Sequence, residues 1–335
     1  MNAQSRLSVL ILVAAVLVTA PVAAATNAAP KKPYNVAWFS TKSNAFLSAE
    51  LAAVLKEAKK LEIKITVFDS GFDANKQYSQ IQDAITLNRF DGFIIVPLNG
   101  PALVPLIQQA LKKKIKIVGS NTPLGPDPFN SGIQIKGVSG QISTSQVERG
   151  WWMAKQMAQA CTGIDPCNVA YMAGVAALPL ELGVRAGFEA MIKRYPNIHE
   201  VAYLDGTGYT TAGGQKVAAD LLVAHPDINV IASEAQGALG AVLAVQAAGR
   251  SVGAGDNQIR VLGIGSACNV IAAIKSGQLY STQPDAAGPQ GKYSVDVMAA
   301  ALGGAIRPQV IDPILRAKIP TVITKANASQ YRCTY

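Results

Sequence analysis

The sequence predicts an α/β fold built from two successive open, parallel sheets. Strand-length apolar runs alternate with amphipathic helices along nearly the whole chain of 335 residues, which is long enough for one large or two medium domains. Half of the residues are hydrophobic and 15% are charged, a composition typical of globular rather than disordered proteins. Because nearly continuous apolar strands are separated by helices of about 10 to 15 residues, we expect βαβ units whose parallel strands are covered on both faces.

Residues 34–61 give the pattern that the rest of the chain repeats. An apolar run at 34–39 has the length and composition of a strand. The polar turn STKSN follows, and apolar residues then return at helical spacing over 46–61. Ligands of open parallel sheets bind just beyond the carboxyl ends of the strands, so this turn is expected to face a small molecule.

The same alternation continues to the end of the chain. In the first half, strands are predicted at 63–68, 92–97, 115–119 and 132–135, and helices at 75–89 and 101–113. In the second half, helices are predicted at 142–160, 182–195, 211–225, 236–248 and 290–302, and strands at 168–172, 199–204, 230–232, 260–264 and 279–282. The region after residue 305 has short extended pieces separated by prolines, which fits a strand that crosses between the two sheets.

The first 25 residues differ from the rest of the chain. Arg6 precedes the apolar run 7–20, and small residues follow through Ala24 and Ala25. This is the pattern of a secretory signal peptide, residues 1–25, and the apolar run is shorter than the ~20 residues that span a bilayer. An uncleaved membrane anchor is the alternative. A cleaved signal peptide implies export from the cytoplasm.

Four cysteines in an exported protein indicate disulfides. Cys161 and Cys167 enclose only TGIDP, a compact loop that a bridge can close, and Cys268 and Cys333 would then form a second, long-range bridge. No metal site is expected, because the two histidines of the chain lie far from the cysteines in sequence. No cofactor is expected either.

The formal net charge of +9 raises the question of nucleic acid binding. The basic run at 112–114 lies on a predicted helix surface, and the sequence holds no recognisable nucleic-acid module. A solvated basic surface is therefore the better interpretation.

The sequence shows no catalytic signature. It has no phosphate-binding P-loop, no HExxH and no G-x-S-x-G. Gly263 and Gly265 follow a predicted strand, but Cys268 stands where a dinucleotide fingerprint needs its third glycine. With only two histidines, a serine or cysteine nucleophile also has few candidate bases. We predict a binding protein and not an enzyme.

Polar and aromatic residues remain at the strand ends and in the helices that follow them. These candidate ligand contacts are Ser43, Asn44, Phe46, Asn121, Arg185, Tyr209, Glu234 and Gln283. Amides, a guanidinium, a carboxylate and aromatic faces suit a neutral polar ligand, because hydroxyls need hydrogen-bonding partners and the C–H face of a sugar packs on rings.

Each candidate has a structural alternative. Asn44 and Asn121 also fit turn and N-cap positions. Arg185 has the spacing to pair with Glu181 or Glu189 on its own helix. Phe46 and Tyr209 could equally be packing residues.

Several segments together resemble the periplasmic sugar-binding proteins of the ribose- and galactose-binding type, whose fold is shared by the effector domains of LacI-type repressors. The segments that carry the resemblance are STKSNAF, DGFIIVPLNGPALVPLIQQALKKKIKIVGSN, GVRAGFEAMI, ASEAQGALGAVLAV, VLGIGS and STQPDAAGPQGKYSVD. The resemblance covers nearly all of the mature chain. It implies ligand contacts in the first lobe at Asn44, Phe46 and Asn121, and in the second lobe at the four candidates from Arg185 to Gln283.

The chain departs from the sugar pattern at four positions. Asn121 and Thr122 stand where the ribose binder has an Asp–Arg pair. In the family an aspartate usually follows the segment VxGF, and here Gly265 follows the corresponding VLGI. Ile264 occupies a position that is aromatic in the family. Two strong acceptors for sugar hydroxyls are thereby missing, so a less hydroxylated sugar derivative, a polyol or another small polar metabolite is a candidate ligand besides a sugar.

The resemblance implies two doubly wound parallel-sheet lobes joined by a three-strand hinge, with the ligand between them. We expect the first lobe at 33–138 plus 285–315 and the second at 140–283 plus 318–335. The implied function is that of a monomeric solute-binding subunit that delivers its ligand to an inner-membrane ABC permease. A periplasmic sensor that presents its ligand to a membrane receptor is the first alternative, and an exported enzyme of unrecognised type is the second.

Overall fold

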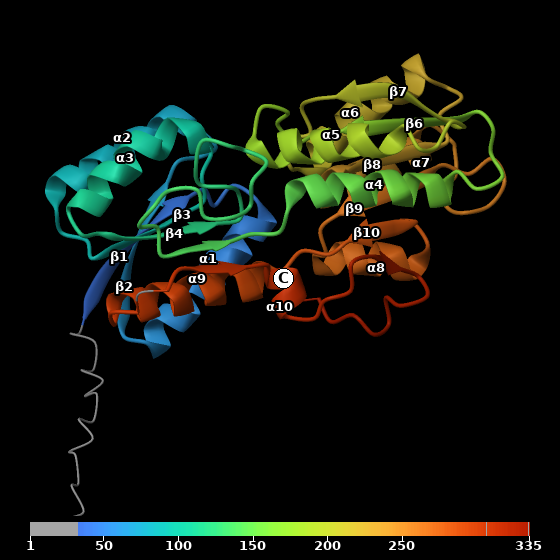
Figure 1. The fold of residues 1–335 in the computed structure, drawn as a ribbon. Helices are drawn as coiled ribbons and strands as arrows, with labels where there is room; N and C mark the ends of the chain where they lie inside the picture. The colour runs from blue at the N-terminus through green and yellow to red at the C-terminus, as the bar shows by residue number, and fades with distance from the viewer. Residues whose placement is uncertain (1–32, 306, 334) are drawn as a thin grey trace, which may run out of the picture.

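The protein consists of two α/β lobes that lie side by side (Figure 1), as the sequence predicts. A computed structural model describes residues 33–305, 307–333 and 335. The predicted signal peptide, residues 1–25, lies outside the described residues. Within the described part of the chain, the helices are too short or too polar to cross a membrane.

The first lobe contains a sheet of six parallel strands. In spatial order these are β11 (Gln309–Ile311), β5 (Gly140–Ile142), β4 (Lys116–Ser120), β3 (Gly92–Ile95), β1 (Tyr34–Ser40) and β2 (Ile63–Asp69). Its helices are α1 (Ala45–Lys60), α2 (Ala74–Leu87), α3 (Gly100–Lys112) and α9 (Ala287–Leu302). The chain order reverses between β1 and β3, which makes the carboxyl ends of these strands the expected ligand edge.

The second lobe repeats this strand order. Its strands are, in space, β12 (Ile323–Thr324), β10 (Ser281–Gln283), β9 (Arg260–Ile264), β8 (Val230–Glu234), β6 (Cys167–Met172) and β7 (Ile198–Leu204). Its helices are α4 (Gln146–Ala160), α5 (Pro179–Ile192), α6 (Thr211–Ala224), α7 (Ala235–Ala247) and α8 (Cys268–Ser276). The edge strand β12 runs antiparallel to β10, whereas the other pairs are parallel.

Both faces of both sheets are buried, which explains why the strands have nearly continuous apolar sequences. On β1, Val36 and Trp38 belong to the core cluster beneath α1 and α9, whereas Ala37 and Phe39 belong to the cluster beneath α2 and α3. Successive side chains of a strand point to opposite faces, so one apolar run serves two cores.

The chain crosses between the lobes three times, at 143–145, 284–286 and 312–322, and the last crossing includes the short helix α10 (Pro313–Arg316). The expected start of the second lobe at residue 140 is wrong, because β5 pairs in parallel with β4, placing Val118 opposite Gly140. A strand of three residues is too short to carry a periodic signal, and the sequence pattern therefore merged it with the following helix.

The strand predicted at 132–135 is also wrong, because this stretch forms a loop. The side chain of Gln134 bonds the main chain at both Asp127 and Asn130, with its Nε2 atom 2.8 and 2.7 Å from their carbonyl oxygens. A side chain therefore supplies the hydrogen bonds that a neighbouring strand would have supplied.

Both predicted disulfides are present, Cys161–Cys167 and Cys268–Cys333. The first closes the loop after α4, and the second links the start of α8 to the end of the described chain.

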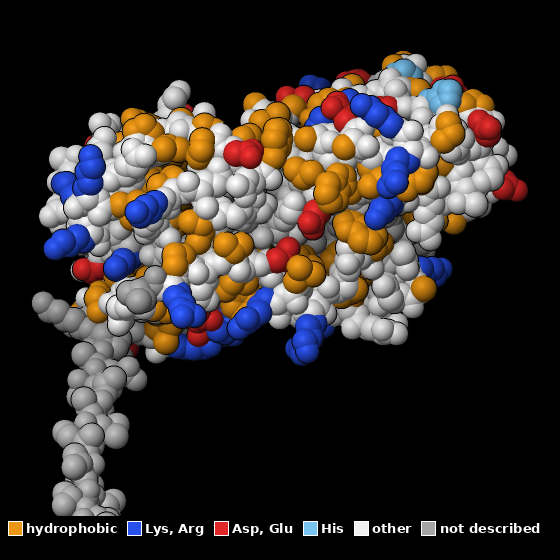
Figure 2. All heavy atoms as spheres, viewed as in Figure 1, with side chains coloured by type: hydrophobic (Ala, Val, Ile, Leu, Met, Phe, Trp, Pro, Cys, Tyr) orange, Lys and Arg blue, Asp and Glu red, His pale blue; other side chains and the backbone are white. Residues whose placement is uncertain are grey.

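Lys and Arg side chains are spread over both lobes on the face shown in Figure 2 rather than gathered in one patch. The basic run at 112–114 is exposed at the end of α3, where Lys113 donates a 2.8 Å hydrogen bond to the carbonyl oxygen of Ile85. These positions agree with a solvated basic surface.

Candidate functional site

A cavity lies between the two lobes, at the carboxyl ends of both sheets. Its volume is about 120 Å³, about four times the volume that one water occupies in the liquid. The wall is mainly apolar with a few polar side chains, which is typical of small-molecule sites. The lining of the cavity includes Asn44, Phe46, Phe72, Asn121, Gln146, Arg149, Tyr209, Glu234, Asp285 and Tyr335.

The turn between β1 and α1 contributes Asn44 to the cavity wall. Its Oδ1 atom caps α1 by accepting a 2.8 Å hydrogen bond from the amide of Leu47. The structural alternative and the ligand hypothesis are therefore compatible, because the cap uses only the oxygen and the amide nitrogen is left for a ligand.

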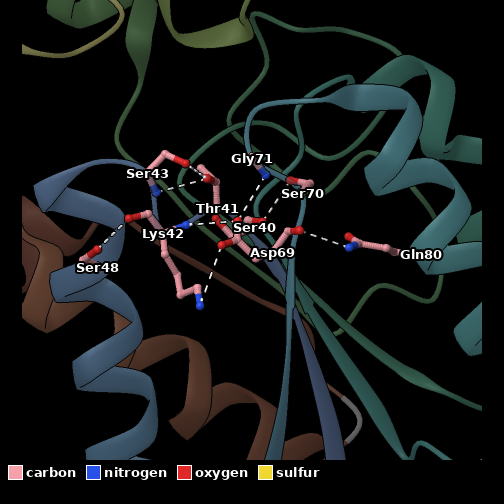
Figure 3. Close-up of polar contacts among 9 residues, drawn as sticks. All are labelled: Ser40, Thr41, Lys42, Ser43, Ser48, Asp69, Ser70, Gly71 and Gln80. Carbon is pink, nitrogen blue, oxygen red and sulfur yellow. Dashed lines mark hydrogen bonds and ion pairs between the residues drawn. The ribbon is translucent and has the colours of Figure 1, made fainter.

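Ser43 lies outside the cavity wall and is exposed to solvent. Its hydroxyl is 2.7 Å from Oγ1 of Thr41, and its amide donates to the same oxygen at 3.1 Å (Figure 3). Nearby, Lys42 forms an ion pair with Asp69 of β2. Ser43 thus shapes the turn that carries Asn44.

Two aromatic pairs connect the lobes at the cavity. The ring of Phe46 meets Tyr335 edge to face at 6.4 Å, and the ring of Phe72 lies 5.6 Å from Tyr209. Tyr209 also covers Gly174, where a Cβ atom would lie 2.2 Å from the ring. Phe46 and Tyr209 therefore serve as packing residues and as cavity wall at once.

Asn121 lines the cavity directly after β4. Its φ of 64° is left-handed, a conformation that asparagine tolerates better than most residues. Its amide donates a 2.8 Å hydrogen bond to the carbonyl oxygen of Ile142, whereas the hydroxyl of Thr122 is bonded to the carbonyl oxygen of Pro97. Of the two, Asn121 keeps its side-chain amide for a ligand.

Glu234 lines the cavity and caps α7. Its carboxylate accepts hydrogen bonds from the amides of Gln236 at 2.9 Å and Gly237 at 2.6 Å. Burial raises the pKa of Glu234 to about 6, although these hydrogen bonds act in the opposite direction.

Gln283 is buried behind the wall instead of in it. Its Nε2 atom donates a 2.9 Å hydrogen bond to the main-chain oxygen of Arg149. Gln283 therefore positions the first turn of α4.

Arg185 is placed away from the cavity, on the side of α5 that faces the edge strand β7. Its guanidinium donates to Glu189 and Glu200 and lies over the ring of Tyr203, 4.6 Å from the centroid. The spacing to Glu189 is one helical turn, so the structural alternative weighed for Arg185 is the arrangement found.

Two cavity residues that the sequence analysis missed lie on the first turn of α4. The Nε atom of Arg149 and the Oε1 atom of Gln146 are buried, and neither has a hydrogen-bond partner among the described residues. Gln146 is only 4% exposed. Such groups are costly to leave unpaired, and both residues line the same cavity, which therefore suits a polar ligand.

A signal for this turn exists in the sequence. The segment Ser145-x-x-Glu148 has the form of a capping box. The Ser145 hydroxyl accepts a 3.2 Å hydrogen bond from the amide of Glu148. The capping box predicts that the helix begins at residue 146 instead of 142. It therefore also predicts that Arg149 lies in the first turn, beside the ligand edge.

Asp285 is a third residue of the wall that was missed. One carboxylate oxygen accepts a 2.9 Å hydrogen bond from Ser266, and the other accepts from the hydroxyl of Tyr335. Burial raises the pKa of Asp285, while the Tyr335 hydrogen bond and the charge of Arg149 counteract this. Burial lowers the pKa of Arg149, and Asp285 opposes that shift.

Within the described residues, no group of histidine, cysteine and acidic side chains is arranged to hold a metal ion. The cavity offers an arginine, amides, carboxylates and aromatic rings, which together can hold a small polar molecule without a metal.

Comparison with known proteins identifies the family. The model of the periplasmic binding protein domain matches residues 37–306. The chain belongs to this family. As a periplasmic binding protein it is placed among binding proteins rather than enzymes, and the resemblance seen in the sequence is confirmed.

Among curated relatives of this periplasmic binding protein, the D-ribose/D-allose-binding protein of Pseudomonas aeruginosa is 24% identical over 93% of this chain and 97% of its own length. The ribose import binding protein of Salmonella typhimurium is 26% identical over 85% of this chain and 90% of its own. A solved structure with the same fold is the arabinose transporter component from Shewanella sp. ANA-3 bound to arabinofuranose. Its TM-score is 0.75 at 22% identity, covering 88% of this chain and 93% of that one.

Proposed function

We propose that the protein is the solute-binding subunit of an ABC importer and captures a sugar or a sugar-like polar solute between its two lobes. The observation that carries this proposal is a cavity between two lobes whose lining includes Arg149 and Gln146, each with a buried polar atom that has no partner among the described residues. The names of the relatives add the ligand class, since they describe binders of ribose, allose and arabinose.

The size of the cavity supports a single monosaccharide or polyol. A cavity of about 120 Å³ is small for a binding site, which favours a ligand of this size over an oligosaccharide. Phe46 and Tyr209 offer ring faces to the C–H side of such a ligand, while Arg149 and Gln146 offer a donor and an acceptor to its hydroxyls.

Among the candidates, the proposed direct contacts are the cavity residues Asn44, Phe46, Asn121, Tyr209 and Glu234, with Gln146, Arg149 and Asp285 added. Ser43 and Gln283 act through the elements that they position. Arg185 is left out of the contact set, because its guanidinium is already paired with two carboxylates.

Ligand capture works by lobe closure. We assign residues 33–142 and 287–311 to the first lobe and residues 146–283 and 323–333 to the second, with hinge bending at the three crossings. A ligand that contacts both walls favours the closed state by its differential affinity for that state. The two aromatic pairs, Phe46–Tyr335 and Phe72–Tyr209, are contacts between lobes that close with it.

Export through a cleaved signal peptide, action as a monomer in the periplasm and delivery to an inner-membrane permease complete the proposal. Support for export comes from the apolar run near the start of the chain, and support for the permease comes from the relatives named as transporter components.

A thermal-shift screen of the purified mature chain tests this function. The panel contains D-ribose, D-allose, L-arabinose, myo-inositol and glycerol, with amino acids as the matched negative set. A bound ligand in hundredfold excess over its dissociation constant stabilises the native state by about 2.7 kcal/mol. Stabilisation by one or more sugars or polyols supports the proposal, and stabilisation by amino acids alone contradicts it.

A further inference from the structure

We propose that Tyr335 is a ligand-contacting residue that helps to set the specificity of the cleft, and that the Cys268–Cys333 disulfide holds it in place. The inference rests on the proposed sugar-binding function and adds a wall of the same site. We call the described residues 323–333 and 335, which carry Cys333 and Tyr335, the tethered segment.

The tethered segment brings Tyr335 into the cavity from outside both sheets. Figure 1 shows the red end of the chain at the junction of the two lobes, and Tyr335 lines the cavity itself. Its main-chain oxygen accepts a 2.7 Å hydrogen bond from the amide of Cys268, the first residue of α8. The residue is therefore fixed both through its main chain and through its side chain.

The side chain of Tyr335 contacts three parts of the site at once. Its ring meets Phe46 of the first lobe, and its hydroxyl donates to Asp285 in the 284–286 crossing. The ring also packs against the core of the second lobe. A ligand in the cavity therefore contacts a residue that packs against both lobes.

Tyr335 also controls how Asp285 is presented. Ser266 occupies one oxygen of this buried carboxylate, and Tyr335 occupies the other. Without the tyrosine hydroxyl, one oxygen of Asp285 would lack its partner inside the cleft, a costly state that rotation of the side chain or a changed ligand contact would relieve. The geometry of Asp285 toward Arg149 therefore depends on the tethered segment.

The cross-link is needed because the tethered segment has little regular structure of its own. Its only strand, β12, has two residues. Besides the disulfide, it is held by a 2.8 Å contact between the hydroxyls of Tyr331 and Ser266. Segments with few backbone hydrogen bonds open readily, whereas a covalent link keeps the attached group at a high effective concentration at its site.

The test compares four variants with the wild type: Tyr335→Ala, Tyr335→Phe, the double variant C268S/C333S and the matched control C161S/C167S. The control removes the other disulfide, which closes a loop at the far end of α4. Calorimetric titration with D-ribose, D-allose, L-arabinose and myo-inositol gives the dissociation constants. We expect Tyr335→Ala and C268S/C333S to weaken binding of the recognised sugar about tenfold or more, Tyr335→Phe to weaken it less, and the control to bind as the wild type does.

A second readout needs no ligand. Hydrogen exchange of two amides reports the tethered segment. The amide of residue 268 donates to the main-chain oxygen of Tyr335. The amide of residue 285 donates to the hydroxyl of Ser266, which in turn contacts Tyr331 of the tethered segment. In C268S/C333S, both amides are expected to exchange at least tenfold faster, and in C161S/C167S they are expected to keep the wild-type rate. Tyr335→Ala leaves both disulfides intact, so it tests the contact separately from the cross-link.

The outcomes separate this inference from the proposed function. If no sugar or polyol binds the wild type, the proposed function fails. If the exchange rates are also unchanged in C268S/C333S, the claim that the disulfide holds Tyr335 in place is wrong as well. If a sugar binds the wild type, and Tyr335→Ala and C268S/C333S bind it equally well, the function stands and the inference is wrong.

Discussion

The first turn of α4 and the second turn of α5 each carry an arginine, and the two arginines have opposite surroundings. The helices pack closely, since a Cβ atom on Gly187 of α5 would lie 1.9 Å from the main-chain oxygen of Val147 of α4. Arg149 faces the cavity with an unpartnered buried Nε, whereas Arg185 is bonded to Glu189 and Glu200. The donors of a paired guanidinium are already bonded within the protein, whereas an unpaired guanidinium that lines a cavity has donors available for a ligand.

The largest effect is expected from Arg149→Ala. Loss of a hydrogen bond to a charged group costs about 1.5–3 kcal/mol, so the affinity for the sugar should fall roughly 10- to 150-fold. Stability without ligand should fall, because the buried carboxylate of Asp285 then loses the positive charge that opposes its burial. Calorimetric titration and thermal melts measure the two quantities. An unchanged affinity would remove Arg149 from the site.

A pH effect is expected from Glu181, which lies one turn before Arg185 and points inward. It accepts hydrogen bonds from the Tyr171 hydroxyl at 2.8 Å and the Gly174 amide at 2.9 Å, and burial raises its pKa from 4.5 to about 7. Between these pH values the folded state holds more protons than the unfolded state, so stability falls as pH rises from about 4.5 to 7.

Glu181→Gln should remove part of that fall, up to about 3 kcal/mol between the two pH values. Urea unfolding at a series of pH values measures it. Glu50→Gln is the counterpart in the first lobe, because burial also raises the pKa of Glu50 to about 7. If the stability of Glu181→Gln falls with pH as steeply as that of the wild type, the raised pKa assigned to Glu181 is wrong.

Gly187→Ala tests the packing that holds the two arginines apart. Because the new methyl group meets a main-chain oxygen, the helices must separate, at a cost of about 1–3 kcal/mol. Sugar affinity should fall too, since α4 carries Arg149. The matched control is Gly288→Ala in α9, where a Cβ atom meets nothing within 4 Å. Equal stabilities of the two variants in urea unfolding would be inconsistent with close packing of α4 and α5.

The smallest effect is expected from Arg185→Ala. Partly exposed ion pairs contribute up to about 1 kcal/mol, so a modest loss of stability and an unchanged sugar affinity are expected. Arg185→Lys keeps the charge and controls for its removal. A loss of binding comparable to that of Arg149→Ala would reverse the comparison of the two arginines.

The fold was largely predictable because its signals are local. Nearly continuous apolar strands such as β1, followed by helices with apolar periodicity, define βαβ units without any knowledge of distant contacts. The exceptions have physical reasons. β5 is too short to show a period, and the loop at 132–135 takes its hydrogen bonds from the Gln134 side chain.

The wall of the first lobe was predicted better than that of the second. Asn44, Phe46 and Asn121 directly follow strands or cap helices, so strand-end reasoning finds them. Arg149 had a local signal, the capping box that begins at Ser145. Asp285 lies in a crossing between the lobes, and Tyr335 reaches the cavity through a disulfide-linked segment. The positions of Asp285 and Tyr335 depend on contacts between residues far apart in the sequence, which single-sequence patterns do not encode.

The most direct test of the account is a crystal structure of the protein with the sugar or polyol that the screen identifies. We predict ligand oxygens within 2.7–3.2 Å of the guanidinium of Arg149 and the side-chain amide of Gln146, with a ring of Phe46, Tyr209 or Tyr335 against the C–H face of the ligand. Arg185 should keep its bonds to Glu189 and Glu200. A ligand bound by Arg185, or one that leaves the first turn of α4 untouched, would contradict the account.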